Sequence, residues 1–237
     1  MVQIVLSPDW FLTKDFVICM FSVITLVLIA AFSLRFYFLN REHKGHLYFA
    51  ISFILIAIAF LFQIITNFSI KYQTVVTKQF GFLTVMTYNT VTLSKILFLV
   101  GHFAHYFLLL IGLYILYVTI DKKSTMNHLL ILYFLIITVL FSNVAYIVFH
   151  LTAVILLGAI AYNYYKIYKE NKNRCTVLLF ASFSVIGLSQ AIMMFTQYKT
   201  IMYAVGSTIQ LVGFVILLIA FILVLKHGKK KQNRYHK

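Results

Sequence analysis

Long apolar runs, separated by short polar segments, make up most of the chain. They fall at about residues 16–39, 47–69, 94–118, 127–143, 146–168, 176–197 and 202–225. A helix needs about 20 mostly apolar residues to cross the hydrocarbon core of a bilayer, and nearly all of these runs reach that length. The pattern therefore predicts an all-α fold with seven transmembrane helices. The fourth run is the shortest, and a brief polar break separates it from the fifth.

The composition favours lipid as the solvent of this chain. Of its 237 residues, 62% are hydrophobic and only 11% are charged. Soluble domains carry about 25% charged residues, so this chain has too few to cover a water-facing surface. We expect a single seven-helix domain over residues 1–237, placed as a multi-pass protein in the cell membrane.

Basic residues are distributed unevenly between the two sides of the predicted helices. Only five of the 20 lysines and arginines fall on one side: Lys14, Lys71, Lys78, Lys95 and Lys199. Since cytoplasmic segments carry the excess of basic residues, the N-terminus is predicted outside and the C-terminus in the cytoplasm. We expect the tail, residues 226–237, to contact anionic lipids, with a docking site for a protein partner as the alternative. The net charge of +15 follows from this topology, and no nucleic-acid partner is predicted.

An internal repeat is visible in the third and seventh runs. The segment "IMYAVGSTIQ" at 201–210 resembles "ILFLVGHFAH" at 96–105, and "FASFSVIGLS" in the sixth run matches "FAISFILIAIA" in the second more weakly. The chain thus divides into a three-span unit at 16–118, a connecting span at 127–143 and a second three-span unit at 146–225. One connecting span gives both units the same orientation, which predicts a parallel 3+1+3 repeat about an axis along the membrane normal.

Polar residues inside the apolar runs gather at one depth. His102 and His105 lie three apart and share a helix face, and the repeat aligns them with Ser207 and Gln210. Polar groups in lipid point into the helix bundle, where they find partners. We therefore predict an outward-opening cavity in the outer third of the membrane. Its candidate ligand-binding residues are His102, His105, His150, Gln63, Gln190, Ser207 and Gln210.

Three classes of function fit these features. The first is a receptor-like, sensor-like or permease-like protein that binds a small ligand and needs no cofactor. The second is a structural or assembly subunit, whose polar groups serve only as interhelical hydrogen bonds. The third is a redox protein with a b-type haem or a transition metal on His102, His105 and His150. The five acidic residues lie outside the runs or at their ends and no nucleophile, base and orienting group are visible together, so the sequence does not favour an enzyme.

The segment around the first join resembles a known sensor family. "RFYFLNREHKGHLYFAISFILIAIAFLF", residues 35–62, is similar to the seven-helix sensor regions that precede bacterial and archaeal histidine kinases. That resemblance implies ligand sensing with a separate signalling partner. The 3+1+3 arrangement also resembles the sugar-efflux and PQ-loop transporters. Their hallmark is a Pro-Gln pair in the first span of each repeat, whereas the only proline here is Pro8.

One connection is longer than the others. It runs from Lys71 to about Thr92 on the side predicted to be external, is rich in Thr, Val and Tyr, and contains Gly81. We expect a short amphipathic lid or a hairpin there.

Overall fold

The computed structural model describes the backbone of residues 10–39, 41, 44–71, 74–80, 83–89, 92–120, 125–141 and 146–235. Side chains are described for residues 10–11, 13–39, 41, 44–67, 98–120, 131–139 and 146–224. The side chains of the tail, which are predicted to contact anionic lipids, lie outside the described residues. The helices are α1 (Leu12–Leu39), α2 (Lys44–Lys71), α3 (Thr92–Ile120), α4 (Thr125–Phe141), α5 (Tyr146–Asn171), α6 (Arg174–Met193, extended by the 3-10 turn Met194–Gln197) and α7 (Ile201–Tyr235).

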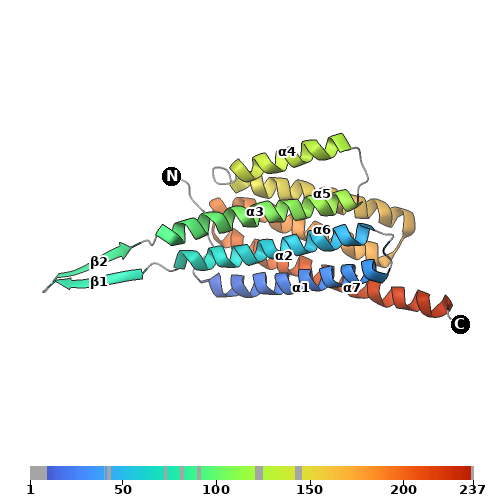
Figure 1. The fold of residues 1–237 in the computed structure, drawn as a ribbon, viewed down its shortest axis with the longest axis horizontal. Coiled ribbons are helices and arrows are strands. Elements are labelled where there is room, and N and C mark those ends of the chain that lie inside the picture. The colour runs from blue at the N-terminus through green and yellow to red at the C-terminus, as the bar shows by residue number, and fades with distance from the viewer. Residues whose placement is uncertain are drawn as a thin grey trace.

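Six of the helices form a closed ring. Going round it, each helix contacts the next in the order α1, α2, α3, α5, α6 and α7, and α7 contacts α1. The helix α4 lies outside this ring against α3 and α5 (Figure 1). Between described residues, α2 and α6 have no backbone contact across the ring. The units α1–α3 and α5–α7 therefore meet along two seams, α1 with α7 and α3 with α5.

The ring has two distinct ends, which we call the hairpin end and the tail end. Figure 1 shows the start of α1 and a β-hairpin at one end and the end of α7 at the other. The hairpin consists of β1 (Thr74–Phe80) and β2 (Leu83–Asn89), paired antiparallel from Thr74 with Asn89 to Phe80 with Leu83. This is one of the two structures expected for the long connection, and it is the exception to the all-α prediction.

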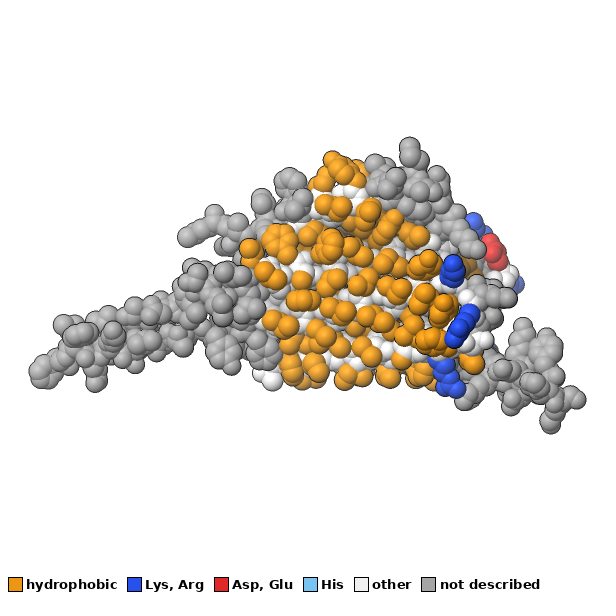
Figure 2. All heavy atoms as spheres, in the orientation of Figure 1, with side chains coloured by type: hydrophobic (Ala, Val, Ile, Leu, Met, Phe, Trp, Pro, Cys, Tyr) orange, Lys and Arg blue, Asp and Glu red, His pale blue; other side chains and the backbone are white. Residues whose placement is uncertain are grey.

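Hydrophobic side chains cover the outside of the bundle. Figure 2 shows them across the middle of the visible face, with lysine and arginine gathered at the tail end. Large apolar residues such as Val100 and Ile155 are more than half exposed there. Soluble monomers rarely expose apolar patches beyond a few hundred Å². The outward face is therefore a lipid-facing surface, and the chain is a multi-pass membrane protein.

The predicted number of spans is confirmed only in part. In the described chain, α1, α2, α3, α5, α6 and α7 are long and apolar enough to cross a membrane. The helix α4 has 17 residues, which at 1.5 Å per residue is about 26 Å and shorter than a hydrocarbon core of about 30 Å. The structure thus supports six spans by length, one fewer than the sequence predicted.

Two glycines make equivalent contacts in the two halves. A methyl group added to Gly112 of α3 would come within 2.5 Å of Ile56 and 3.0 Å of the Ser52 carbonyl oxygen on α2. One added to Gly213 of α7 would come within 2.5 Å of Ile186 on α6, and the Ser182 carbonyl oxygen lies 3.4 Å away. In each half, Ser and Ile four residues apart thus hold a glycine of the next helix.

These contacts bear on the register of the repeat. The sequence alignment paired Gly101 with Gly206, which are 105 positions apart, whereas Gly112 and Gly213 are 101 apart. Gly101 and Gly206 also make equivalent contacts, with Thr66 and the Phe62 carbonyl oxygen on α2 and with Met193 and the Ser189 carbonyl oxygen on α6. The two glycine pairs therefore give registers that differ by four residues, about one helical turn. The 3+1+3 repeat stays a prediction, and the glycine contacts fit both registers.

The close approach at Gly112 gives a direct test of this packing. Replacing Gly112 by Ala should destabilise the protein by about 1–3 kcal/mol, because the new methyl group overlaps a packed side chain and the backbone. Gly158→Ala on α5 is the matched control, since nothing lies within 4 Å of a methyl group there. It should be neutral or slightly stabilising, because alanine favours a helix over glycine. Thermal melting of the two purified variants in detergent makes the comparison, and equal losses would contradict the α2–α3 packing.

Candidate functional site

A cavity of about 70 Å³ lies within the ring, between helices of both units. Its lining residues near the helix ends, Asn67 of α2 and Phe98 of α3, flank the hairpin connection, so the cavity lies toward the hairpin end. Its polar lining comprises Gln63, Thr66, Asn67, His102, His105, Tyr106, Tyr146, His150, Gln190, Tyr203 and Gln210. A volume of this size can hold a few water molecules or a small polar molecule.

Six of the seven predicted site residues line this one cavity. They are His102, His105, His150, Gln63, Gln190 and Gln210. Ser207 is the exception: it is buried but does not line the cavity. Tyr203 and Gln210 lie about one turn to either side of it on α7 and have longer side chains, which reach the cavity in its place.

The side chain of His150 is held by a hydrogen bond to a neighbouring amide. Its Nδ1 lies 2.7 Å from Oε1 of Gln190. An amide oxygen only accepts, so Nδ1 carries the proton and donates it, and Nε2 of the neutral ring is an acceptor. The side chain is 4% exposed, and Nε2 has no hydrogen-bond partner in the structure. A buried polar atom without a partner is uncommon in native proteins and calls for an explanation such as a ligand or water.

His105 is oriented in the same way on the opposite side of the cavity. Its Nδ1 lies 2.8 Å from the Ala59 carbonyl oxygen of α2, so Nδ1 donates there and Nε2 is the acceptor of the neutral ring. The partner of His105 is therefore a backbone carbonyl, whereas that of His150 is a glutamine side chain. His102 packs instead among aromatic rings, stacked on Phe98 at 5.7 Å and 4.2 Å from the Tyr106 ring centre.

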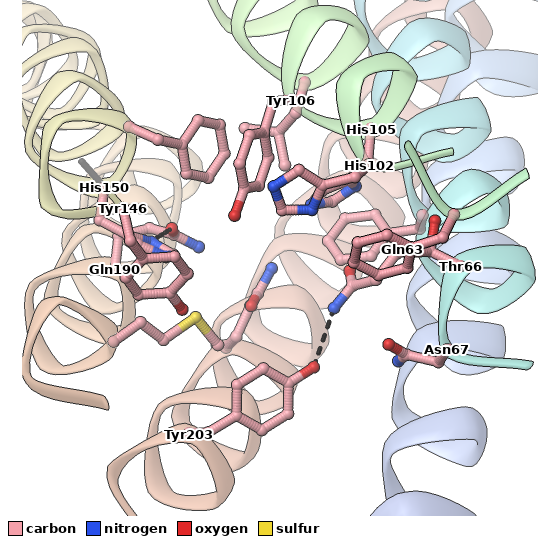
Figure 3. A pocket seen from close by; sticks show the side chains of 16 residues that line it. Gln63, Thr66, Asn67, His102, His105, Tyr106, Tyr146, His150, Gln190 and Tyr203 are labelled. Carbon is pink, nitrogen blue, oxygen red and sulfur yellow. Dashed lines mark hydrogen bonds between the residues drawn. The ribbon is translucent and has the colours of Figure 1, made fainter. Parts of the chain in front are cut away.

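A second polar network borders the cavity and was not predicted. Asp15, in the first turn of α1, is 1% exposed. Its Oδ2 accepts from Nδ2 of Asn67 at 2.8 Å and from the Tyr203 hydroxyl at 2.9 Å. The same hydroxyl accepts from Nε2 of Gln63 at 3.0 Å, the bond drawn in Figure 3. Asn67, Gln63 and Tyr203 line the cavity, so the network joins its wall to a carboxylate and ties α1, α2 and α7 together.

Aromatic rings form much of the remaining wall. Tyr106 of α3 stacks on Phe149 of α5 with ring centres 3.8 Å apart and planes at 18°, across the seam between the units. Tyr146 lies 4.3 Å from His150, edge to face. In Figure 3 the labelled rings of Tyr106, Tyr146 and Tyr203 stand around the open centre, with His150 and Gln190 facing His102 and His105 across it. The cavity wall therefore contains aromatic rings as well as hydrogen-bonding atoms.

A layer of side chains at the floor of this polar cavity separates it from a second, smaller cavity with apolar walls. Phe60, Leu109, Gln190 and Gln210 line both, and the second cavity has about 30 Å³ and otherwise only apolar walls. Phe60 of α2 meets Phe214 of α7 at 5.5 Å at this level. Since α2 and α7 are not neighbours in the ring, these side chains cross its interior. The polar site is thus closed toward the tail end by the hydrophobic core.

The geometry bears on the haem and metal alternative. Among the residues that the structure describes, no three His, Cys, Asp or Glu side chains lie close enough together to hold a metal ion. Pockets for drug-sized molecules measure about 300–1,000 Å³, and a haem is at least that large. A cavity of about 70 Å³ does not accept a haem. The bonds from Nδ1 of His105 and His150 would suit metal-ligating histidines, but the described side chains do not supply a third ligand in reach.

Comparisons with protein-family models, with curated proteins and with solved structures found no match to this chain. Its function is therefore argued from the residues of the site.

Proposed function

We propose that this integral membrane protein binds a small polar molecule in the cavity of its six-helix ring, as a receptor or permease does. The observation that carries the proposal is the buried, unpartnered Nε2 of His150, a side chain that is 4% exposed and lines the cavity with five other polar residues selected from the sequence alone. A ligand that donates a hydrogen bond to this atom would remove the cost of leaving it bare, about 1–3 kcal/mol.

The proposal includes an orientation in the membrane. The described basic residues at the tail end, among them Arg35, Arg41, Lys44 and Arg174, are exposed, and Lys14 and Lys199 lie at the other end. By the positive-inside rule, the tail end faces the cytoplasm and the cavity faces outward. The ring and the directions of α3 and α5 require α4 to return the chain from one end to the other (Figure 1), which favours seven crossings. Anionic lipids at the basic end are the expected lipid contacts.

The competing proposal is a structural or assembly subunit. In that case the polar side chains would only join helices, as the bond between His150 and Gln190 does. Interhelical hydrogen bonds in membrane proteins contribute about 0.6–2 kcal/mol each. Such bonds explain the polar atoms that take part in them. They give no role to the cavity or to the unpartnered Nε2 of His150, so the ligand-binding proposal is preferred.

Thermal melting against small probes of three charge classes separates these proposals. The purified full chain is heated in detergent with glycerol and ethanol, with ethylammonium chloride, or with sodium acetate, each against sodium chloride at equal ionic strength. Ligand binding predicts that at least one class raises the melting temperature with saturation, by mass action. His150→Phe should abolish that rise, and His46→Phe, an exposed position at the tail end, should keep it. No saturable rise with any class would favour the structural subunit.

A further inference from the structure

We propose that the ligand of this cavity is a small primary ammonium ion, an inference that rests on the proposed function and names its ligand class. A primary alkylamine is protonated at pH 7, as the lysine side chain is, and its ammonium group offers three hydrogen-bond donors and no acceptor. The cavity is complementary to such a group in hydrogen bonding, in its aromatic walls and in charge.

Protein partners fix three cavity atoms as acceptors. His150 and His105 donate from Nδ1 to Gln190 and Ala59, so each neutral ring presents Nε2 as an acceptor. Tyr203 has a single hydroxyl proton, which it donates to Asp15, so its oxygen can only accept from any further group. It already accepts from Gln63 and has a second lone pair. A molecule with several donors can bond to all three of these acceptors, which an ammonium group does and a carboxylate does not. The hydroxyl of Tyr106 and the amide of Gln210, also in the lining, can accept a further bond.

Aromatic faces line the same space. Phe60, Phe98, Tyr106, Tyr146 and Phe149 contribute to the wall, and Tyr106 and Phe149 are stacked on each other. A cation within about 6 Å of an aromatic ring centre is attracted by its π electrons, by about 2 kcal/mol or more in a site without water. This attraction separates an ammonium ion from a neutral alcohol of the same size.

The charges around the cavity also favour a cation. Among the described side chains, no lysine or arginine lines the cavity. The carboxylate of Asp15 lies directly behind Asn67 and Tyr203, one hydrogen bond from the wall. In the low dielectric of a helix bundle this negative charge acts over a longer distance than it would in water. An anion would meet repulsion from this carboxylate.

Size limits the ligand to a few non-hydrogen atoms. The cavity of about 70 Å³ suits methylammonium or ethylammonium, with the alkyl group directed toward the apolar floor formed by Phe60 and Leu109. Tetramethylammonium is larger and has no N–H group. It therefore tests whether hydrogen-bond donation, rather than positive charge alone, is recognised.

The experiment compares isosteric probes on the purified full chain in detergent. Ethylammonium chloride should raise the melting temperature with saturation, whereas ethanol, sodium acetate and tetramethylammonium chloride at the same concentration should match the sodium chloride control. His150→Phe and Asp15→Asn should each weaken the apparent affinity for ethylammonium by at least tenfold, measured against the melting temperature of the same variant without ligand. His46→Phe should leave that affinity unchanged.

The outcomes separate this inference from the proposed function. A saturable shift with ethanol, glycerol or acetate in place of ethylammonium would overturn the ammonium assignment and leave a ligand-binding cavity. An equal shift with tetramethylammonium would overturn the role given to the acceptor nitrogens. No shift with any probe would overturn both proposals.

Discussion

Replacing Tyr203 by phenylalanine should lower the free energy of unfolding by about 2–3 kcal/mol, although it removes a single oxygen atom. That oxygen donates to the buried carboxylate of Asp15 and accepts from the amide of Gln63. Hydrogen bonds to charged groups contribute about 1.5–3 kcal/mol, and removing one partner leaves the other to bear its desolvation cost. The loss should appear as a melting temperature several degrees lower in detergent.

A matched control is available on α5. Tyr162 is 66% exposed on the outside of the bundle, so Tyr162→Phe should change stability by less than about 0.5 kcal/mol. A double-mutant cycle adds a second measurement. In an Asp15→Asn background, Tyr203→Phe should cost less, because a neutral amide loses less than a carboxylate when its donor is removed. The network would be refuted if Tyr203→Phe and Tyr162→Phe melted at the same temperature.

The network is also what closes the ring at the hairpin end. Asp15 belongs to α1, Asn67 and Gln63 to α2, and Tyr203 to α7, so the bonds join the first and last helices beside the cavity. Weakening it should loosen the seam between α1 and α7. The stability of the protein and the shape of the cavity therefore both depend on the hydrogen bonds among these four residues.

The sequence could predict the helices and most of the site because both follow from the lipid solvent. Apolar run lengths place the helices to within a few residues, and α2 at Lys44–Lys71 contains the run predicted at 47–69. Polar residues at one depth have to face inward, and His105, His150 and Gln190 line one cavity. These inferences need two facts only. Side chains repeat in direction about every 3.6 residues of a helix, and a polar group without a hydrogen-bond partner is costly in hydrocarbon.

Other features depend on which helices become neighbours, and the sequence does not state that. Asp15 precedes an apolar run and looks like a solvated end, but it is buried where α1 meets Asn67 of α2 and Tyr203 of α7. Ser207 was chosen through the register that pairs Gly101 with Gly206, but its short side chain does not line the cavity, whereas Tyr203 and Gln210 do. The signal available for Tyr203 was its place in "IMYAVG", one turn before Ser207, where an aromatic hydroxyl could reach the cavity.

The orientation and openness of the cavity decide between the proposed site and a closed helix core. Met193 lines the cavity from α6, and Leu151 follows His150 on α5 but is 45% exposed on the lipid-facing side. These two positions lie near the same level, one inside the ring and one outside. A single cysteine at each, in a chain with Cys19 and Cys175 replaced by serine, can be treated in intact cells with a membrane-impermeant thiol reagent carrying an ammonium group.

Labelling of Met193→Cys from outside is the measurement that tests an outward-opening cavity most directly. The thiol should react in intact cells and should be protected by saturating ethylammonium, whereas Leu151→Cys, buried in lipid, should not react. A cysteine at Gln232, in the tail, should react only after the cells are permeabilised, because the tail end faces the cytoplasm. Failure of Met193→Cys to react from outside in folded protein, or reaction of the tail cysteine in intact cells, would contradict the proposed cavity and its orientation.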